Sequence, residues 1–330
     1  MSQQPFDPKS LNLDRLGRMT EEEARAAMES IRWPDGPVCP HCQAAKATRI
    51  NGTSPKVRDG LLRCGACGKQ FTVTVGTIFE DSHIPLHKWL LATRLICASK
   101  KGMSAHQLWR MLGFGSYQTA WFMAHRIREG MREAHLPEPM GGPNKVVEID
   151  ETYVGGKEAN KHKSQRKHAG RGAVGKAPVV SLVERDGSVR SFHVPNVTAQ
   201  TLRPIIVANV HKASYLMTDE AAVYPAIGSG FGGHGSVNHS AEEYVRASFW
   251  HTNTVESYFA IFKRGIYGVY HHVSERHLHR YGAEFDFRYN HRMALGYSDA
   301  DRARLAVKGI EGKRLTYRKP YVTPERPAAH

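Results

Sequence analysis

The sequence predicts an α/β protein in which a mixed five-stranded sheet with flanking helices is preceded by two small modules. Three observations support this prediction. Residues 146–297 alternate between strand-like and helix-like segments. Residues 37–82 hold two closely spaced pairs of cysteines. Residues 83–136 show helical spacing of apolar residues and contain two sites suited to starting a helix, with glycines between them.

The composition favours a polyanionic partner. The chain has 46 Lys and Arg residues against 31 Asp and Glu residues among 330, and its formal charge is +15. A membrane partner is disfavoured, because no long basic amphipathic helix is evident and no apolar run approaches the roughly 18 residues that span a bilayer. The first ten residues lack the apolar core of a signal peptide. We therefore expect a cytoplasmic protein whose cysteines form no disulfide framework.

The N-terminal segment, residues 1–36, is polar and contains one predicted helix. Thr20 and Glu23 match a capping box, and apolar residues follow at helical spacing. Trp33 and Pro34 are expected to end this helix.

Residues 37–82 are predicted to form a zinc ribbon. Four cysteines occur as two CxxC pairs separated by 21 residues (43–63): Cys39, Cys42, Cys64 and Cys67. Two such pairs can hold one tetrahedral Zn²⁺ through four thiolates, and a metal with four protein ligands is structural rather than catalytic. His41 is a weaker alternative ligand. The alternating residues 70–75 predict a strand.

Residues 83–136 predict a helix-turn-helix DNA-binding region. Ser104 and Ser116 are good N-cap residues on either side of a turn that contains Gly113 and Gly115. Residues near the start of the second helix are expected to meet base edges: Tyr117, Gln118 and Thr119. Arginines on its later turns are expected to meet phosphates: Arg126 and Arg128. The alternative is an ordinary helical hairpin with a solvated basic face. Cys97, on an apolar helix face, is expected to be a core thiol.

The region 146–297 follows a linker rich in proline and glycine. We expect strands near 146–150, 179–185, 189–195, 215–219 and 236–239. Asp186 and Gly187 predict a hairpin turn, and Thr198 predicts a helix start. Long helices are expected from about 253 and from about 275 to 291. This order of strands and helices is that of an RNase H-like domain. Residues 298–330 are expected to form a peripheral basic tail.

Three carboxylates are the candidate catalytic groups of this region. Asp150 and Asp219 each close an apolar strand, and Glu256 lies on a helix face together with Lys263, two turns further on. Carboxylates at adjacent strand ends, joined by one from a helix, can converge on a pair of hard divalent cations. Two alternatives remain open at this point. Glu151 could substitute for Asp150, and Glu256 could merely complete a capping box with Asn253.

The loop between the first two strands of this region is strongly basic. Its candidate DNA-contacting residues are Lys161, Lys163, Arg166, Lys167 and Arg171. A solvated surface loop is possible, but counterion release on DNA explains the composition better.

The chain resembles bacterial insertion-sequence transposases of the DDE type, in the group with an N-terminal zinc ribbon (ISXO-two-like). The resemblance spans about residues 30–295. Its marks are the segments Arg32–Cys42, Ile149–Lys157, Thr218–Glu220, His251–Phe259, Lys263–Gly268 and Arg288–Arg292. The third catalytic position varies in that group between glutamate and asparagine. Glu256 is preferred because Lys263 then stands in the usual relation to it, and Asn253 is the alternative.

The resemblance implies magnesium-dependent (or manganese-dependent) DNA cleavage and strand transfer. Asp150 would bridge two metal ions, Asp219 and Glu256 would bind one each, and Lys263 would orient a phosphate. The implied partners are double-stranded DNA, as transposon ends and target, and at least one further copy of the chain on that DNA. The implied location is the bacterial nucleoid. Two other functions remain possible: a catalytically silent DNA-binding protein derived from a transposase, and an RNase H-like nuclease or resolvase.

Overall fold

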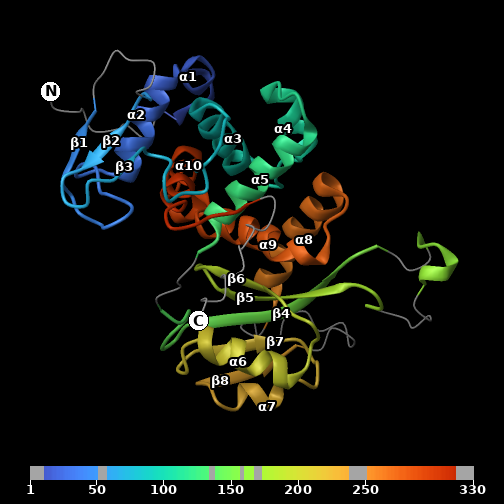
Figure 1. Ribbon diagram of the computed structural model, residues 1–330. Helices are drawn as coiled ribbons and strands as arrows, with labels where there is room; N and C mark the ends of the chain where they lie inside the picture. The colour runs from blue at the N-terminus through green and yellow to red at the C-terminus, as the bar shows by residue number, and fades with distance from the viewer. Residues whose placement is uncertain are drawn as a thin grey trace, which may run out of the picture.

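The computed structural model describes residues 11–50, 58–133, 138–156, 160–166, 173–237 and 251–316. Two bodies stack on one another (Figure 1). The first is a helical body that carries a three-stranded sheet, and the second is an α/β body built on a five-stranded sheet. The chain returns to the first body near its C-terminal end, where α10 (Asp299–Lys308) packs against α3 (Leu86–Ala98).

The first body begins with the predicted capped helix. Thr20 is the N-cap of α2 (Glu21–Arg32), and it exchanges hydrogen bonds with Glu23 as a capping box, which confirms the prediction. A short helix, α1 (Leu13–Arg18), precedes it. Trp33 ends α2 and packs edge-on against Phe71 of the three-stranded sheet.

The small sheet is antiparallel, with the order β1-β2-β3. Its strands are β1 (Ala47–Arg49), β2 (Leu62–Cys64) and β3 (Gln70–Phe71). The strand predicted over 70–75 is therefore too long. Beyond Phe71 the backbone closes a turn in which the Val75 N–H donates to the Thr72 carbonyl, so the remaining apolar side chains reach the core from a loop.

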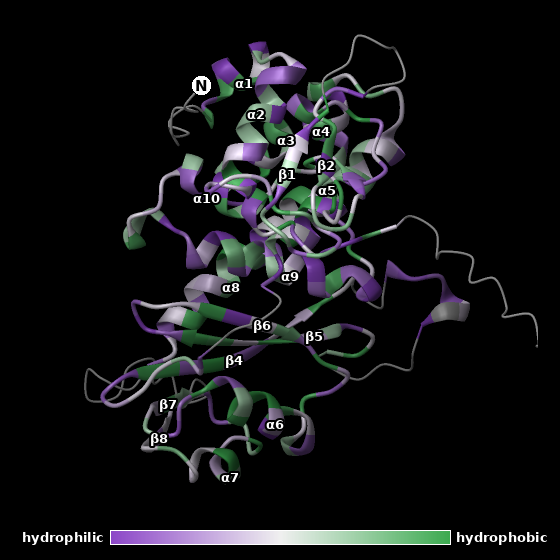
Figure 2. Ribbon diagram, turned by 60° about the vertical axis from the view of Figure 1, so that its left-hand side comes forward, coloured by the Kyte–Doolittle hydropathy of each residue, from purple (hydrophilic) through white to green (hydrophobic). Residues whose placement is uncertain are grey.

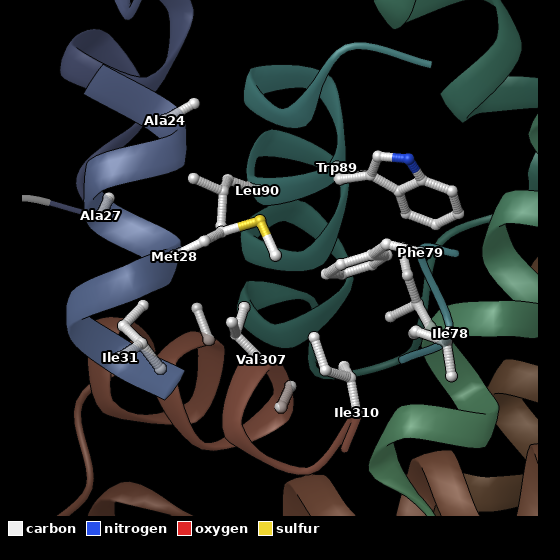
Figure 3. Close-up of a cluster of buried hydrophobic side chains, with 14 of the residues drawn as sticks. Ala24, Ala27, Met28, Ile31, Ile78, Phe79, Trp89, Leu90, Val307 and Ile310 are labelled. Atoms are coloured by element: carbon white, nitrogen blue, oxygen red, sulfur yellow. The ribbon is translucent and has the colours of Figure 1, made fainter. Parts of the chain in front are cut away.

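One continuous core joins the small sheet to the helices of the first body. Met28 of α2, Leu90 of α3 and Val307 of α10 meet within it (Figure 3). The expectation that residues from 298 onward form a peripheral tail is wrong for 299–310. Ala303, Ala306, Val307 and Ile310 are buried there, because α10 is amphipathic and its apolar face completes the core. Residues 317–330 lie outside the described chain.

The α/β body confirms the predicted mixed five-stranded sheet with flanking helices. The strand order is β6-β5-β4-β7-β8, in which β4 pairs antiparallel with β5 and parallel with β7. The strands are β4 (Val146–Val154), β5 (Ala177–Glu184), β6 (Val189–His193), β7 (Tyr215–Thr218) and β8 (Gly233–Ser236). Asp186 has a positive φ of 57° in the predicted hairpin turn between β5 and β6. The last strand lies three residues earlier than its predicted start at 236.

Helices cover both faces of this sheet (Figure 1). One face packs against α8 (Asn253–Gly265) and α9 (Glu275–Asn290), through a cluster that includes Val179, Phe259 and Phe285. The other face packs against α6 (Ala199–Asn209) and the short α7 (Pro225–Gly228). Thr198 is the N-cap of α6, as predicted. The site-bearing strand β4 is thus enclosed between two apolar layers.

A buried ion-pair network joins the two bodies where α5 (Tyr117–Met131) crosses α9. Arg128 Nε donates to Glu284 Oε2 at 2.5 Å, Tyr270 donates to Oε1 at 2.6 Å, and Arg288 pairs with the same carboxylate. Burial alone would raise the pKa of Glu284, but the two guanidinium groups lower it to about 2. The carboxylate therefore stays ionised inside the protein.

This network corrects one sequence-based expectation. Arg128 is only 1% exposed and is paired with Glu284, so its predicted contact with a DNA phosphate is wrong. Arg126 is also buried, and its Nε donates to the Leu315 carbonyl. The later turns of α5 are buried on all sides, so both arginines are enclosed although they point in nearly opposite directions from the helix, and the sequence alone did not reveal this burial.

Replacing Arg128 by methionine is expected to lower the free energy of unfolding by about 3–5 kcal/mol, because Glu284 then stays buried with one of its charge partners removed. The control is Arg132→Met, which removes an arginine from a half-exposed pair with Glu129. That change is expected to lower stability by at most ~1 kcal/mol. Urea unfolding of both variants measures the difference, and equal effects would contradict a stabilising role for the Arg128 pair.

Candidate functional site

The candidate catalytic carboxylates lie at one edge of the five-stranded sheet. Glu148 of β4 pairs with Met217 of the parallel strand β7, so the carboxyl ends of both strands point the same way. Asp150 lies further along β4, and Asp219 directly follows β7. Oxygens of Asp150, Glu151 and Asp219 all lie within 4.8 Å of one another. All three residues are half-buried.

Glu151 belongs to this group beside Asp150 rather than in place of it. Neighbouring side chains of a strand normally point to opposite faces. Here Asp150 Oδ1 accepts a hydrogen bond from the Glu151 N–H at 2.7 Å, which turns the Asp150 carboxylate toward its neighbour. The buried Tyr224 hydroxyl donates to Glu151 Oε2 at 2.6 Å. The sequence indicates Glu151 only as a substitute for Asp150, because side chains of neighbouring strand residues normally point to opposite faces.

Burial, together with the crowding of carboxylates, raises the pKa of Asp150 to about 7. Burial is the largest cause, and the charges of Glu151, Asp219 and Glu256 add to it. Burial, together with the charge of Asp219, also raises the pKa of Glu151. A buried cluster of carboxylates favours the binding of protons or metal cations, because their positive charge removes the repulsion between the carboxylates.

Glu256 approaches this group from α8. Its charge acts on Asp150, but it lies outside the 4.8 Å group formed by the other three acids of the described chain. The alternative in which Glu256 completes a capping box with Asn253 is wrong, because Thr252 is the N-cap and Asn253 is already the first helical residue. The Thr252 hydroxyl instead donates to Glu256 Oε1 at 2.9 Å. Lys263 is exposed two turns along the same helix.

The four paired cysteines are positioned to bind zinc. The Sγ atoms of Cys39 and Cys67 are 3.8 Å apart and those of Cys42 and Cys64 are 3.6 Å apart, and all four lie within 4.8 Å of one another. Thiolates about 2.3 Å from a tetrahedral zinc ion would be about 3.8 Å apart, so the cluster has the required size.

Backbone amides also favour metal binding by this cluster. The N–H groups of Cys67 and Ala66 point at Cys64 Sγ, at 3.4 and 3.3 Å, and they lower the pKa of that thiol to about 6 despite the opposing effect of burial. By contrast, burial raises the pKa of Cys97 to about 12, so this cysteine is the inert core thiol that its position on an apolar helix predicts.

The residues predicted to contact DNA differ in their exposure to solvent. Ser104 and Ser116 are the N-caps of α4 (Ala105–Leu112) and α5, as predicted, and Gly113 has a positive φ of 62° between them. Tyr117 and Gln118 are exposed at the start of α5, and Thr119 is partly exposed.

Residues 160–166, the described part of the basic loop between β4 and β5, stand away from the sheet (Figures 1 and 2). Lys163 and Arg166 are exposed there, and Lys161 is partly exposed. Lys167 and Arg171 lie outside the described residues. Among the helices that the structure describes, none has the length and apolar character needed to cross a membrane.

Comparison with known proteins identifies the family. Residues 141–290 match the model of the ISXO2-like transposase domain, and residues 19–70 match that of the transposase zinc-ribbon domain. The chain is 30% identical over 259 residues to an uncharacterized protein in transposable element ISH50 of Halobacterium salinarum, which covers 74% of this chain and 83% of that relative.

A solved structure, the cryo-EM structure of the simian T-cell lymphotropic virus intasome in complex with PP2A regulatory subunit B56 gamma, overlaps 54% of this chain and 63% of its own matched chain. The identity is 15% and the TM-score is 0.27, so this overlap supports no structural conclusion. The two family models and the halobacterial relative are sufficient: the chain belongs to the ISXO2-like transposases that carry an N-terminal zinc ribbon.

Proposed function

We propose that this protein binds the terminal inverted repeats of its insertion sequence and catalyses their cleavage and transfer to target DNA, with Mg²⁺ or Mn²⁺ as cofactor. The observation that carries the proposal is the convergence of Asp150 and Asp219 at one sheet edge, with Glu256 facing them from α8. The strand order of this sheet also agrees with an RNase H-like catalytic domain.

The donor set fits hard divalent cations. All its ligand atoms are carboxylate oxygens, which Mg²⁺ and Mn²⁺ prefer, and the mutual repulsion of these groups favours added positive charge. Asp150, Asp219 and Glu256 would hold the ions, with Glu151 available beside Asp150. Bound there, the ions would supply an activated water and neutralise charge on the reacting phosphate. Lys263, exposed on the helix of Glu256, would orient a neighbouring phosphate.

Hydrolysis at the end of the element would free a 3′-hydroxyl, which then attacks a phosphodiester of the target. This chemistry depends on positioning and charge neutralisation, so no covalent protein nucleophile is needed. Since two ends must be joined to one target, at least a dimer is expected on DNA. Such a reaction belongs in the cytoplasm, at the nucleoid.

Two surfaces are proposed to hold the DNA. In the first, α4 and α5 act as a helix-turn-helix, with Tyr117, Gln118 and Thr119 at the exposed start of α5 facing the bases. The second is the basic segment that carries Lys161, Lys163 and Arg166, which would follow the phosphate backbone beside the acids.

Replacing Glu256 by glutamine is expected to preserve folding and binding to transposon ends while reducing cleavage in Mg²⁺ by about 100-fold or more, which corresponds to about 3 kcal/mol. The reason is that an amide replaces one anionic ligand. Labelled oligonucleotides that carry the element's inverted repeats report both binding and cleavage.

Glu275→Gln is the matched control for this experiment, because Glu275 occupies the first turn of α9 as Glu256 occupies that of α8. This control is expected to cleave as the wild type does. Undiminished cleavage by Glu256→Gln would indicate that Asn253 or Glu151, and not Glu256, supplies the third catalytic group. End binding by a wild-type protein that never cleaves would instead favour a catalytically silent DNA-binding protein, and cleavage without transfer would favour a nuclease or resolvase.

A further inference from the structure

Glu148 is a fully buried carboxylate two residues before Asp150 on β4, and it faces the start of α8. Its Oε2 accepts hydrogen bonds from the backbone N–H groups of Thr254 at 2.8 Å and Val255 at 2.9 Å. Its Oε1 accepts one from the Thr254 hydroxyl at 2.9 Å. Three hydrogen bonds thus connect the strand that carries Asp150 to the first turn of the helix that carries Glu256.

Two further groups tie the same carboxylate to the segment that precedes α8. Arg185 Nε donates to Glu148 Oε1 at 2.6 Å, and Arg185 Nη2 donates to the carbonyl of His251 at 2.9 Å. The His251 ring nitrogen Nδ1 lies 3.2 Å from Glu148 Oε1. The buried negative charge is therefore compensated by a guanidinium on one side and by the start of a helix on the other.

This arrangement replaces the usual cap of α8. The first N–H groups of a helix lack partners within the helix, and the N-cap side chain normally accepts from one of them. The N-cap here is Thr252, whose hydroxyl donates to Glu256 Oε1 and makes no capping bond with the described first turn. Glu148 accepts from that turn in its place, and a carboxylate is favoured there by the helix dipole as well. The Thr252 hydroxyl contacts Glu256 and helps to orient it.

We propose that Glu148 is a positioning residue that sets the place of Glu256 relative to Asp150, and so the affinity of the site for divalent metal. The inference rests on the proposed function of these carboxylates. Side chains two positions apart on a strand lie on one face about 7 Å apart, so Glu148 fixes α8 against β4 immediately beside the metal ligands. A small shift of α8 would move Glu256 while leaving Asp150 and Asp219 in place.

The test measures Mn²⁺ binding without DNA, by the loss of the free Mn²⁺ signal in electron paramagnetic resonance. Glu148→Gln is expected to bind Mn²⁺ at least 10-fold more weakly than wild type, because an amide cannot accept from both helix N–H groups and pair with Arg185. The Mg²⁺ concentration for half-maximal cleavage should rise by a similar factor. Asp150→Asn supplies the baseline for Mn²⁺ bound elsewhere.

The matched control is Glu184→Gln. Glu184 also accepts a backbone N–H, but that of Gly141 in the linker before β4, and its carboxylate pairs with Lys145. Its substitution is expected to leave Mn²⁺ affinity unchanged. Thr254→Val removes only the hydroxyl bond to Glu148 and should weaken Mn²⁺ binding by 2- to 5-fold, so it decides the question if Glu148→Gln does not fold.

The outcomes separate the inference from the function on which it rests. A wild-type protein that binds Mn²⁺ no better than Asp150→Asn would overturn the proposed metal site itself. A wild type that binds Mn²⁺, with a folded Glu148→Gln or Thr254→Val of unchanged affinity, would overturn only the positioning role of Glu148.

Discussion

Replacing Asp150 by asparagine is expected to reduce metal-dependent cleavage of transposon-end DNA by about four orders of magnitude or more, equivalent to ~5.5 kcal/mol. Asp150 is the acid on which the charges of Glu151, Asp219 and Glu256 all act, so it occupies the centre of the candidate site. Asparagine has the same shape but loses the charge, and its amide nitrogen cannot bind a cation.

The same substitution should not destabilise the metal-free protein. In the fold, the pKa of Asp150 is raised from the ordinary value of 3.8 to about 7, so ionising this group opposes folding. That unfavourable effect is absent below about pH 3.8, grows as the pH rises toward 7, and is complete above it. The melting temperature of Asp150→Asn should therefore equal or exceed that of wild type at pH 8 without metal. The advantage should shrink as the pH falls through this range.

Asp286→Asn is the control for both effects. Asp286 is a buried carboxylate that accepts from Ser191 and Tyr258 and lies outside the acidic group. Its loss should lower stability without changing cleavage by the folded protein. If Asp150→Asn cleaved within 10-fold of wild type, the catalytic assignment of the strand-end acids would be wrong. A large loss of both activity and melting temperature would point to a structural role.

The second large effect is expected on removal of zinc. Wild-type protein should contain about one zinc ion per chain, and Cys64→Ser should abolish that content and unfold the region around the small sheet. Cys39 and Cys64 are themselves buried in the core that includes Trp33, Leu62 and Phe71, so losing the metal also opens this apolar cluster. Structural zinc contributes roughly 10–16 kcal/mol of binding free energy at neutral pH, much of which becomes folding free energy.

Elemental analysis measures the zinc, and limited proteolysis measures the unfolding. Cys97→Ser is the matched control, since Cys97 is buried on α3 and is not one of the four clustered cysteines. It should keep full zinc content while losing some stability. Zinc-free protein with a protease-resistant N-terminal body would contradict the structural role of the metal.

Short-range patterns predicted much of the architecture. The capping box at Thr20, the caps at Ser104, Ser116 and Thr198, and the turn at Asp186 are all present, because each depends on groups within a few residues of one another. Four of the five strands were also predictable, since apolar runs closed by turn residues must pair with something. The last strand, Gly233–Ser236, is not an apolar run and lies three residues before its predicted start. The proximity of the two candidate aspartates, Asp150 and Asp219, followed from one rule, that the carboxyl ends of neighbouring parallel strands lie at the same edge of a sheet.

Such short-range patterns cannot predict contacts between segments that are distant in the sequence. The sequence predicts a peripheral tail where α10 lies, because nothing in its own residues shows that they pack into a core near α2 and α3. It predicts a phosphate contact for Arg128 for a similar reason. Basic residues on a helix are ordinarily solvated, and only the packing of α5 against α9 brings Arg128 to Glu284, 156 residues away.

The sequence by itself therefore determined the elements, the zinc cysteines and the identity of the strand-end acids, since local hydrogen bonding and hydrophobic periodicity specify these. The tertiary structure alone decided how the acids are held. Tyr224 reaches Glu151 across 73 residues, and Glu148 caps a helix that begins more than 100 residues later. Nothing in the sequence around a carboxylate in a strand indicates which distant residue it will contact. Its role becomes visible only when burial obliges each polar group to find one.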